Sequence, residues 1–475
     1  MSKQMSGSSP LREPETAAAS RAARSTLAAR WGRWRRVAEA ARNRVTARAK
    51  TGVRRQIAAL AAVAGLVVPL AATLPATAPA AAGTGQPDMV TQWNLTMITG
   101  LEAAAIPPPP SARIGAIVQT SVFDAVNGID RQYAYYHVPP AAPRGASRPA
   151  AAAGAAYTAL VALIPAQKPL FDAQLAATLA ELSDDPANPG PAVKRGLAWG
   201  TTVATGILAW RATDGFTTPP PTYTVGSAAG DWQPTPPAFL GPPTAPLFRQ
   251  FATMTPFALT SPSQFRPPGP PPLDSARWAR ALAEVQALGS ATSTIRTPEQ
   301  TQTAIFWQDD TPAAMWNRVA DQLAQASDLP LAQNARLLAQ LNIALADATI
   351  AIWNAKNHYN FWRPVTAIRA TSDPTWTPLL PTPAFQEYPS AHSGVSSAAA
   401  TVLASFYGDA TAFTVTSAGL PGVQRDFTTF SAAVLQVEDA RIYAGFHFRF
   451  SCIDAATLGA HVANYVTSTL MQPLR

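Results

Sequence analysis

The segment from Lys356 to Pro364, with the sequence KNHYNFWRP, holds two cations seven residues apart, Lys356 and Arg363. On a continuing helix, two turns would bring both cations to one side. That side continues the apolar stripe that includes Ile352, so the pair is expected to be buried. A buried cation needs an anionic partner. Asp347, another carboxylate or a bound anion could be that partner.

A second segment, YPSAHSG, spans residues 388–394. Ser390 follows a proline and precedes an alanine-rich stretch, which predicts the N-cap of a helix that continues to about Phe406. The Ser390 hydroxyl and the free N–H groups from Ala391 onward would then face an anion at the positive end of the helix dipole. His392, in the first turn, can donate a hydrogen bond or exchange a proton near neutral pH. A helix cap beside a surface histidine would give the same pattern.

The third segment, DARIYAGFHFRF, begins at Asp439. Arg441 and His447 are six residues apart, which on a straight helix places them about 120° out of phase. Gly445 predicts that the helix ends there and releases His447 onto a turn, while Arg441 supplies charge from the helix end. A core histidine packed between phenylalanines is the other reading of His447.

In this order, Lys-x6-Arg-Pro, Pro-Ser-x-His and Arg-x3-Gly-x-His form a three-part signature within about 90 residues. The signature resembles the superfamily of the vanadium-dependent haloperoxidases and the type-2 phosphatidate phosphatases, and looks most like exported bacterial haloperoxidases. The resemblance implies an all-α fold with two four-helix bundles. It also implies vanadate (V5+) as the cofactor, without haem or nucleotide.

By motif position, the resemblance assigns a role to each matching residue. The three cations would hold the equatorial oxygens of vanadate, and the serine hydroxyl with the next backbone N–H would add hydrogen bonds. His447 would be the metal ligand, His392 the acid/base at the apical oxygen, and Lys356 a further catalytic group that polarises bound peroxide. The implied cofactor-binding residues are Lys356, Arg363, Ser390, Ala391, Arg441 and His447.

Two aromatic residues match positions near the halide in fungal chloroperoxidases. They are Trp353, three residues before Lys356, and Phe385, five residues before Ser390. Either could instead be an ordinary core residue.

Ser451 departs from the phosphatase pattern, because the phosphatases keep an aspartate four residues after the histidine that acts as nucleophile. A nucleophilic histidine needs a carboxylate to orient it, whereas a metal-ligating one needs only an acceptor such as a backbone carbonyl or Ser451. Two smaller departures are Ala391 in place of a glycine and Ala440 in place of a serine. The missing aspartate favours the haloperoxidase.

The implied reaction is the oxidation of halide by hydrogen peroxide to hypohalous acid, which then halogenates a small organic substrate. One alternative is a soluble acid phosphatase that uses His447 as nucleophile. Another is an inactive oxyanion-binding relative. The oligomeric state is left open.

Helices must position these residues, and the alanine-rich, low-charge composition favours helices packed on helices. Helical patterns alternate with proline-rich loops, and the longest loop, about 216–273, shows no periodicity. The predicted helices are 111–129, 150–182, 192–212, 274–290, a helix from Pro312, and 331–357.

The N-terminal region predicts an export signal. Residues 1–55 contain 14 Lys and Arg against 3 Asp and Glu, so the remainder of this +8 chain is slightly acidic and gives no sign of nucleic-acid binding. Arg54 and Arg55 precede an apolar run, Ile57–Leu74, and then Ala-x-Ala sites. We therefore expect a leader, 1–82, exported by the Sec or twin-arginine route.

The expected mature chain is one helical haloperoxidase-like domain, 83–475, with the oxyanion-site motifs in 353–454 and no stable membrane span. The single cysteine, Cys452, excludes an internal disulfide. A downstream translation start or an uncleaved membrane anchor would also explain the long basic leader.

Overall fold

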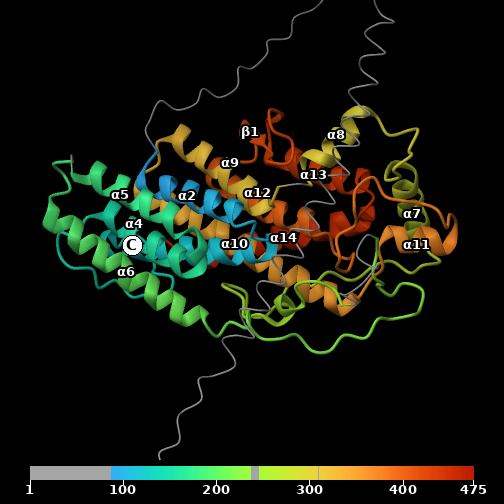
Figure 1. Ribbon diagram of the computed structural model, residues 1–475, viewed down its shortest axis with the longest axis horizontal. Coiled ribbons are helices and arrows are strands. Elements are labelled where there is room, and N and C mark those ends of the chain that lie inside the picture. The colour runs from blue at the N-terminus through green and yellow to red at the C-terminus, as the bar shows by residue number, and fades with distance from the viewer. Residues whose placement is uncertain (1–86, 184, 237–244, 309, 475) are drawn as a thin grey trace, which may run out of the picture.

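Helices make up nearly all the regular structure in the computed structural model, which describes residues 87–183, 185–236, 245–308 and 310–474. The predicted all-α fold is confirmed (Figure 1). The expected leader, 1–82, lies outside the described residues. The elements are α2 (Met89–Ala103), α3 (Pro108–Asp130), α4 (Arg148–Leu163), η1 (Pro165–Gln167), α5 (Lys168–Ser183), α6 (Gly190–Arg211), η2 (Arg249–Thr253), α7 (Ala276–Leu288), α8 (Pro298–Phe306), α9 (Pro312–Ser327), α10 (Leu331–Tyr359), α11 (Pro364–Thr371), α12 (Ala391–Tyr407), β1 (Phe413–Thr416), β2 (Gln424–Phe427), α13 (Phe430–Tyr443) and α14 (Arg449–Thr469).

Helix boundaries follow proline and capping signals in the sequence. Thr311 caps α9, because its hydroxyl accepts a hydrogen bond from the Ala314 N–H at 3.1 Å, directly before Pro312. The predicted helical stretch 150–182 is divided into α4 and α5, which are bent by 118° relative to each other. Pro165 stands at the break, where its ring and missing N–H prevent a continuous helix.

The central element is α10. Residues 337–353 are all buried, so the apolar stripe predicted for this helix is part of a surface that neighbouring helices cover on every side. Within the described ranges, α10 is the one single helix long and apolar enough to cross a membrane, and 94% of its most apolar window lies inside the protein. The bent α4–α5 pair passes the same length and hydropathy test only when its two parts are counted together.

Two helix bundles meet along α10. On one side α3 packs on α10 and is itself covered by α4 and α6, and on the other side α12 and α14 pack on α10 and on each other (Figure 1). The crossing of α12 and α14 is very close, because a Cβ atom on Gly459 would overlap the carbonyl oxygen of Gly394. This crossing fixes the start of α12, where the Pro-Ser-x-His motif lies.

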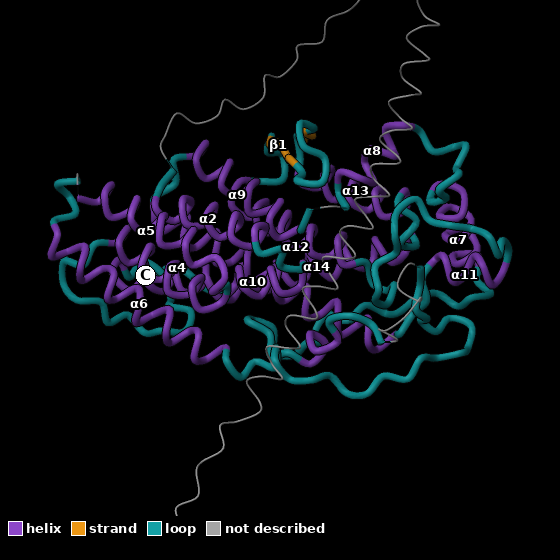
Figure 2. The backbone as a smooth tube through the Cα atoms, in the orientation of Figure 1, coloured by secondary structure: helices purple, strands orange, loops and turns teal. Residues whose placement is uncertain are grey.

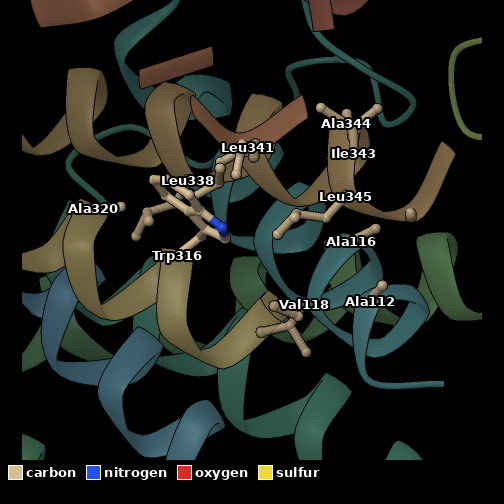
Figure 3. Packing of buried hydrophobic residues seen from close by; sticks show 14 of the residues in the cluster. Ala112, Ala116, Val118, Trp316, Ala320, Leu338, Leu341, Ile343, Ala344 and Leu345 are labelled. Atoms are coloured by element: carbon tan, nitrogen blue, oxygen red, sulfur yellow. The ribbon is translucent and has the colours of Figure 1, made fainter. Parts of the chain in front are cut away.

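The core near α10 combines large and small side chains (Figure 3). Alanines on α3 and α9 let those helices approach the leucines of α10, and Trp316 fills the wider space between α9 and α10. Burial of one such leucine contributes about 1.5–3 kcal/mol. The residues at this junction are Ala112, Ala116 and Val118 of α3, Trp316 and Ala320 of α9, and Leu338, Leu341, Ile343, Ala344 and Leu345 of α10.

The described parts of the proline-rich stretch, 216–236 and 245–273, run along α10 mostly as loop, seen in Figure 2 as teal tube below the helices. The Asp347 carboxylate of α10 accepts hydrogen bonds from the N–H groups of Phe257, Ala258 and Leu259 at 2.6, 2.7 and 2.9 Å. This buried carboxylate therefore satisfies backbone donors that have no helix or sheet partner.

Three asparagines on and after the last turns of α10 hold the same stretch further along. Asn354 accepts from the Arg266 guanidinium at 2.6 Å and donates to the Ala252 carbonyl at 2.9 Å. Asn357 accepts from Arg249 at 3.2 Å, and Asn360 accepts from the Tyr223 hydroxyl at 2.8 Å. We call Asp347, Asn354, Asn357 and Asn360 the α10 anchors.

Asp124 of α3 holds the loop after that helix in the same manner. Its carboxylate accepts hydrogen bonds from the N–H groups of Tyr136, His137 and Val138 at 2.7, 2.8 and 2.8 Å. Burial raises the pKa of Asp124 to about 6, against the three hydrogen bonds, which favour its ionised form.

Candidate functional site

Lys356 and Arg363 lie on either side of a sharp turn. α10 ends at Tyr359, Asn360 is left-handed with φ 46°, and Arg363 is extended directly before α11. The predicted alignment over two helical turns is therefore wrong, because the helix stops between the two residues. The chain reversal brings them together instead, and both side chains are fully buried.

The Lys356 ammonium is held by neutral groups. Nζ donates to the carbonyl oxygens of Gln386 and Glu387 at 2.7 and 2.9 Å. Asp347 is not its partner, because that carboxylate binds the backbone of the proline-rich stretch. An ammonium has three N–H donors, so one remains for a ligand.

Arg363 faces the ring of His447. Its Nε donates to the Phe385 carbonyl at 2.8 Å, and Nη1 donates to the Phe446 carbonyl at 3.0 Å and lies 3.2 Å from His447 Nε2. Its Nη2 is buried and has no hydrogen-bond partner among the described residues. A buried guanidinium with a free donor suits an oxyanion, which can accept from several N–H groups at once.

Ser390 is the N-cap residue of α12, as predicted, but its hydroxyl makes no capping bond. It lies 2.9 Å from the Ser393 hydroxyl instead. The first N–H groups of α12, beginning with Ala391, therefore have no side-chain cap, as an anion site at a helix N-terminus requires. His392 follows in the first turn, and its Nε2 is buried with no partner among the described residues.

The end of α13 agrees with the predicted role of glycine. The helix stops at Tyr443, and Gly445 has φ 82°, which favours a residue without a side chain. A Cβ atom there would also lie 2.7 Å from the Gly289 carbonyl oxygen. Arg441 thus remains on the last turn of α13 while His447 lies on the connection to α14, and both are buried.

The hydrogen bonds of His447 define its tautomer. Arg363 can only donate, so His447 Nε2 must be the acceptor in that contact. The proton of the neutral ring is then on Nδ1, which donates to Glu387 Oε1 at 2.8 Å. The Nε2 lone pair is directed toward the cations.

The buried cations act on both predicted histidines. Burial first, and then the charges of Arg363, Lys356 and Arg441, lower the pKa of His447 well below its usual value. Burial followed by the same three cations lowers the pKa of His392. Both imidazoles are therefore neutral near pH 7.

Burial also lowers the pKa of Lys356 well below its usual value, and the neighbouring guanidinium of Arg363 lowers it further. Burial raises the pKa of Glu387 to about 7, whereas the positive charges of Arg363 and Lys356 act to lower it. Keeping each of these groups charged inside the protein carries a desolvation free energy. A bound anion would offset that free energy for the cations.

Trp353 and Phe385 lie side by side next to Lys356. Their ring centroids are 5.2 Å apart, and the Lys356 ammonium is 5.2 Å from the centre of the Phe385 ring. Trp353 is buried and donates from its indole N–H to the Leu247 carbonyl at 3.2 Å, whereas Phe385 is half-buried. The predicted halide vicinity is thus an aromatic wall beside the cations, formed by one core residue and one partly open residue.

Sequence reasoning missed two residues of this pocket. Glu387 lies three residues before Ser390, and its position directly before the second motif was the signal that could have found it. Gln308, between α8 and α9, accepts a hydrogen bond from Arg441 Nη2 at 2.9 Å. No motif surrounds Gln308, so the sequence alone offered no signal.

Comparison with known proteins agrees with this geometry. Residues 336–475 match the family model of the VCPO second helical-bundle domain. A bacterial vanadium-dependent iodoperoxidase is similar in structure, with TM-score 0.69 and 27% identity over 82% of this chain and 97% of that one. This chain has the vanadium haloperoxidase fold. The resemblance predicted from the three motifs is confirmed.

Two further relatives support the same assignment. The holo form of a bacterial vanadium-dependent chloroperoxidase shares the fold, with TM-score 0.62 and 18% identity over 77% of this chain and 93% of that one. Vanadium chloroperoxidase of Curvularia inaequalis is 30% identical over 164 residues, which cover 28% of this chain. The match spans about a quarter, 26%, of the length of that curated relative.

The residues present in this haloperoxidase fold suit vanadate. Arg363 Nη2 and His392 Nε2 are buried polar atoms that a bound oxyanion would satisfy, and His447 Nε2 offers a lone pair 3.2 Å from Arg363 Nη1. The described residues contain no group of three or more His, Cys, Asp or Glu that could hold a metal cation. The donors are instead cations, N–H groups and one imidazole, the set that holds an oxyanion.

Proposed function

We propose that this protein is a vanadate-dependent haloperoxidase that oxidises halide with hydrogen peroxide to hypohalous acid. The observation that carries the proposal is the contact between Arg363 Nη1 and His447 Nε2, 3.2 Å apart in a buried cluster of cations. It leaves a neutral imidazole nitrogen facing a site that suits an oxyanion. A small organic molecule rich in electrons would be the final acceptor of the halogen.

In this proposal three cations, one imidazole and the start of α12 would hold the cofactor. Lys356, Arg363 and Arg441 would neutralise the charge of its oxygens, and His447 Nε2 would be the ligand to vanadium. The Ser390 hydroxyl and the Ala391 N–H complete the cradle at the start of α12. Bound vanadate supplies Lewis-acid activation of hydrogen peroxide without a change in oxidation state.

His392 moves the proton in this scheme. Its lowered pKa leaves the imidazole neutral near pH 7, so one ring nitrogen can accept a proton from hydrogen peroxide and return one to the leaving oxygen. Lys356 would supply positive charge at the oxyanion site, where negative charge develops during the reaction. Trp353 and Phe385 would form an apolar wall that limits water near the halide.

The test is to add orthovanadate to purified protein and follow peroxide-dependent bromination and iodination of a dye. We expect activity that saturates with vanadate and disappears without peroxide or halide. Cleavage of p-nitrophenyl phosphate that vanadate only inhibits would contradict the proposal and favour a phosphatase. Vanadate binding without either activity would indicate an inactive oxyanion-binding relative.

One observation favours the phosphatase as the second candidate. The absence of an aspartate at Ser451 argued against a nucleophilic histidine, but Glu387 provides a carboxylate to His447 Nδ1 at 2.8 Å. Such a contact could orient a nucleophile and stabilise its cation, so the argument from Ser451 no longer separates the two enzymes. The homology to vanadium haloperoxidases keeps the haloperoxidase first.

A further inference from the structure

Glu387 is the residue that connects the second and third motifs. Its Oε1 accepts from His447 Nδ1 at 2.8 Å and from the Phe448 N–H at 3.0 Å. One carboxylate oxygen thus binds both the ring of His447 and the backbone that follows it. Glu387 is itself fully buried, and its backbone carbonyl accepts from Lys356.

The position that the phosphatases give to an aspartate lies close to this contact. Ser451 is fully buried in the first turn of α14, and its hydroxyl favours the ionised form of Glu387. The Ser451 carbonyl accepts from the Ser390 N–H at 3.2 Å. Two different backbone positions, 387 and 451, therefore reach one region behind the His447 ring.

We propose that Glu387 is a positioning residue that replaces the carboxylate missing at position 451. It holds the proton of His447 on Nδ1, and it thereby keeps the Nε2 lone pair aimed into the pocket. The proposal deepens the proposed function, since Nε2 is the nitrogen assigned to vanadium. The tautomer itself can be measured without vanadate and without turnover.

The carboxylate is needed at this place for a geometric reason. Neutral imidazole has two tautomers of similar energy, and only the one with the proton on Nδ1 can accept from Arg363. A carboxylate accepts but cannot donate, so it selects that tautomer. A carboxamide can turn and donate its own N–H to Nδ1, which would move the ring proton to Nε2 and block the ligand nitrogen.

The experiment compares four variants with the wild type: Glu387→Gln, Glu387→Asp, Ser451→Ala and the double variant Glu387→Gln with Ser451→Asp. The tautomer is read from ¹⁵N NMR of histidine-labelled, vanadate-free protein, in which the chain has five histidines to assign. Orthovanadate affinity is measured by calorimetry. Thermal unfolding shows which variants are folded.

In the wild type we expect a proton on Nδ1 of His447. Glu387→Gln should lose this signature and bind vanadate about 10–100-fold more weakly, the usual effect of removing the partner of a metal-ligating histidine. Glu387→Asp and Ser451→Ala should keep the signature. The double variant, which moves the carboxylate to position 451, should regain the Nδ1 proton and most of the affinity.

Retention of the Nδ1 proton in Glu387→Gln would overturn the proposal, whether or not vanadate binding changed. If the double variant folds but has the same His447 tautomer and vanadate affinity as Glu387→Gln, a carboxylate at position 451 cannot replace the one at position 387. If the double variant fails to fold, the comparison of Glu387→Gln with Glu387→Asp decides the role. Lack of halide oxidation by the wild type would refute the proposed function alone, because the tautomer is read without turnover.

Discussion

Gln308 Oε1 accepts a hydrogen bond from Arg441 Nη2 at 2.9 Å, although the two residues are 133 positions apart in the chain. The two residues directly before Gln308 are themselves fixed by contacts with other elements. The Trp307 indole donates to Gln436 at 2.9 Å, and the Phe306 carbonyl accepts from the Ser417 hydroxyl at 2.6 Å. The last cation of the site is therefore oriented by a loop outside all three motifs.

Gln308→Leu should weaken vanadate binding about 5–30-fold, because a hydrogen bond to a charged group contributes about 1–2 kcal/mol here. Calorimetric titration with orthovanadate measures the change. Gln436→Leu is the matched control, because it removes the hydrogen bond from Trp307 to α13 and leaves Gln308 in place. Equal losses in the two variants would mean that loop stability, and not the contact with Arg441, is responsible.

The three cations should each be necessary for tight binding. Lys356→Ala, Arg363→Ala and Arg441→Ala should each cost about 2–4 kcal/mol of vanadate affinity, the usual result of removing one buried charged partner. Arg277→Ala, which removes an exposed guanidinium that pairs with Asp454, is the control and should bind normally. A cation whose loss leaves affinity unchanged does not belong to the site.

The two histidines should differ in which step they support. His447→Ala should lose most vanadate affinity and all halide oxidation, because Nε2 is the proposed ligand. His392→Ala should still bind vanadate moderately but turn over about 10²–10⁴-fold more slowly, the usual contribution of a positioned acid/base. Vanadate titration and dye bromination on both variants give the comparison, and equal loss of binding would contradict the division of roles.

Asp124 should make stability depend on pH. Its pKa in the folded protein, about 6, lies above the ordinary 3.8, so the folded state binds this proton more tightly than the unfolded state. This contribution to the free energy of unfolding is complete below pH 3.8 and is lost as the pH rises through 6. Asp124→Asn cannot titrate, so the wild type should gain about 2 kcal/mol relative to it between pH 8 and pH 4.5. Urea unfolding of both proteins measures this, and a difference independent of pH would refute the assignment.

The basic leader should be removed on export. The apolar run and the Ala-x-Ala sites place the mature N-terminus near Gly83. N-terminal sequencing of protein recovered from outside the cytoplasm tests this directly. Recovery of exported protein that still begins before Ile57 would instead support an uncleaved anchor.

The sequence predicted those parts of the site that depend on local signals. Gly445 and Ser390 marked helix ends that the structure has at these positions, because left-handed backbone and capping are properties of a few neighbouring residues. Lys356 and Arg363 were expected together for the wrong reason, although two local signals indicated a break between them: the helix was itself predicted to end at 357, and Asn360 is a residue type that tolerates left-handed backbone. Gln308 could not be predicted from the sequence, because its partner Arg441 is distant along the chain.

The α10 anchors determine where the proline-rich stretch can accept insertions and deletions during evolution. The described parts of the proline-rich stretch are held to α10 by side chains at separate points, and an isolated backbone bridge pairs Asp231 with Phe361 just after the helix. Residues between two anchors can be inserted or deleted at little cost in free energy, since loop-closure entropy grows slowly with length. The helix that carries Lys356 and Trp353 therefore stays constant while the loop beside it is free to diversify.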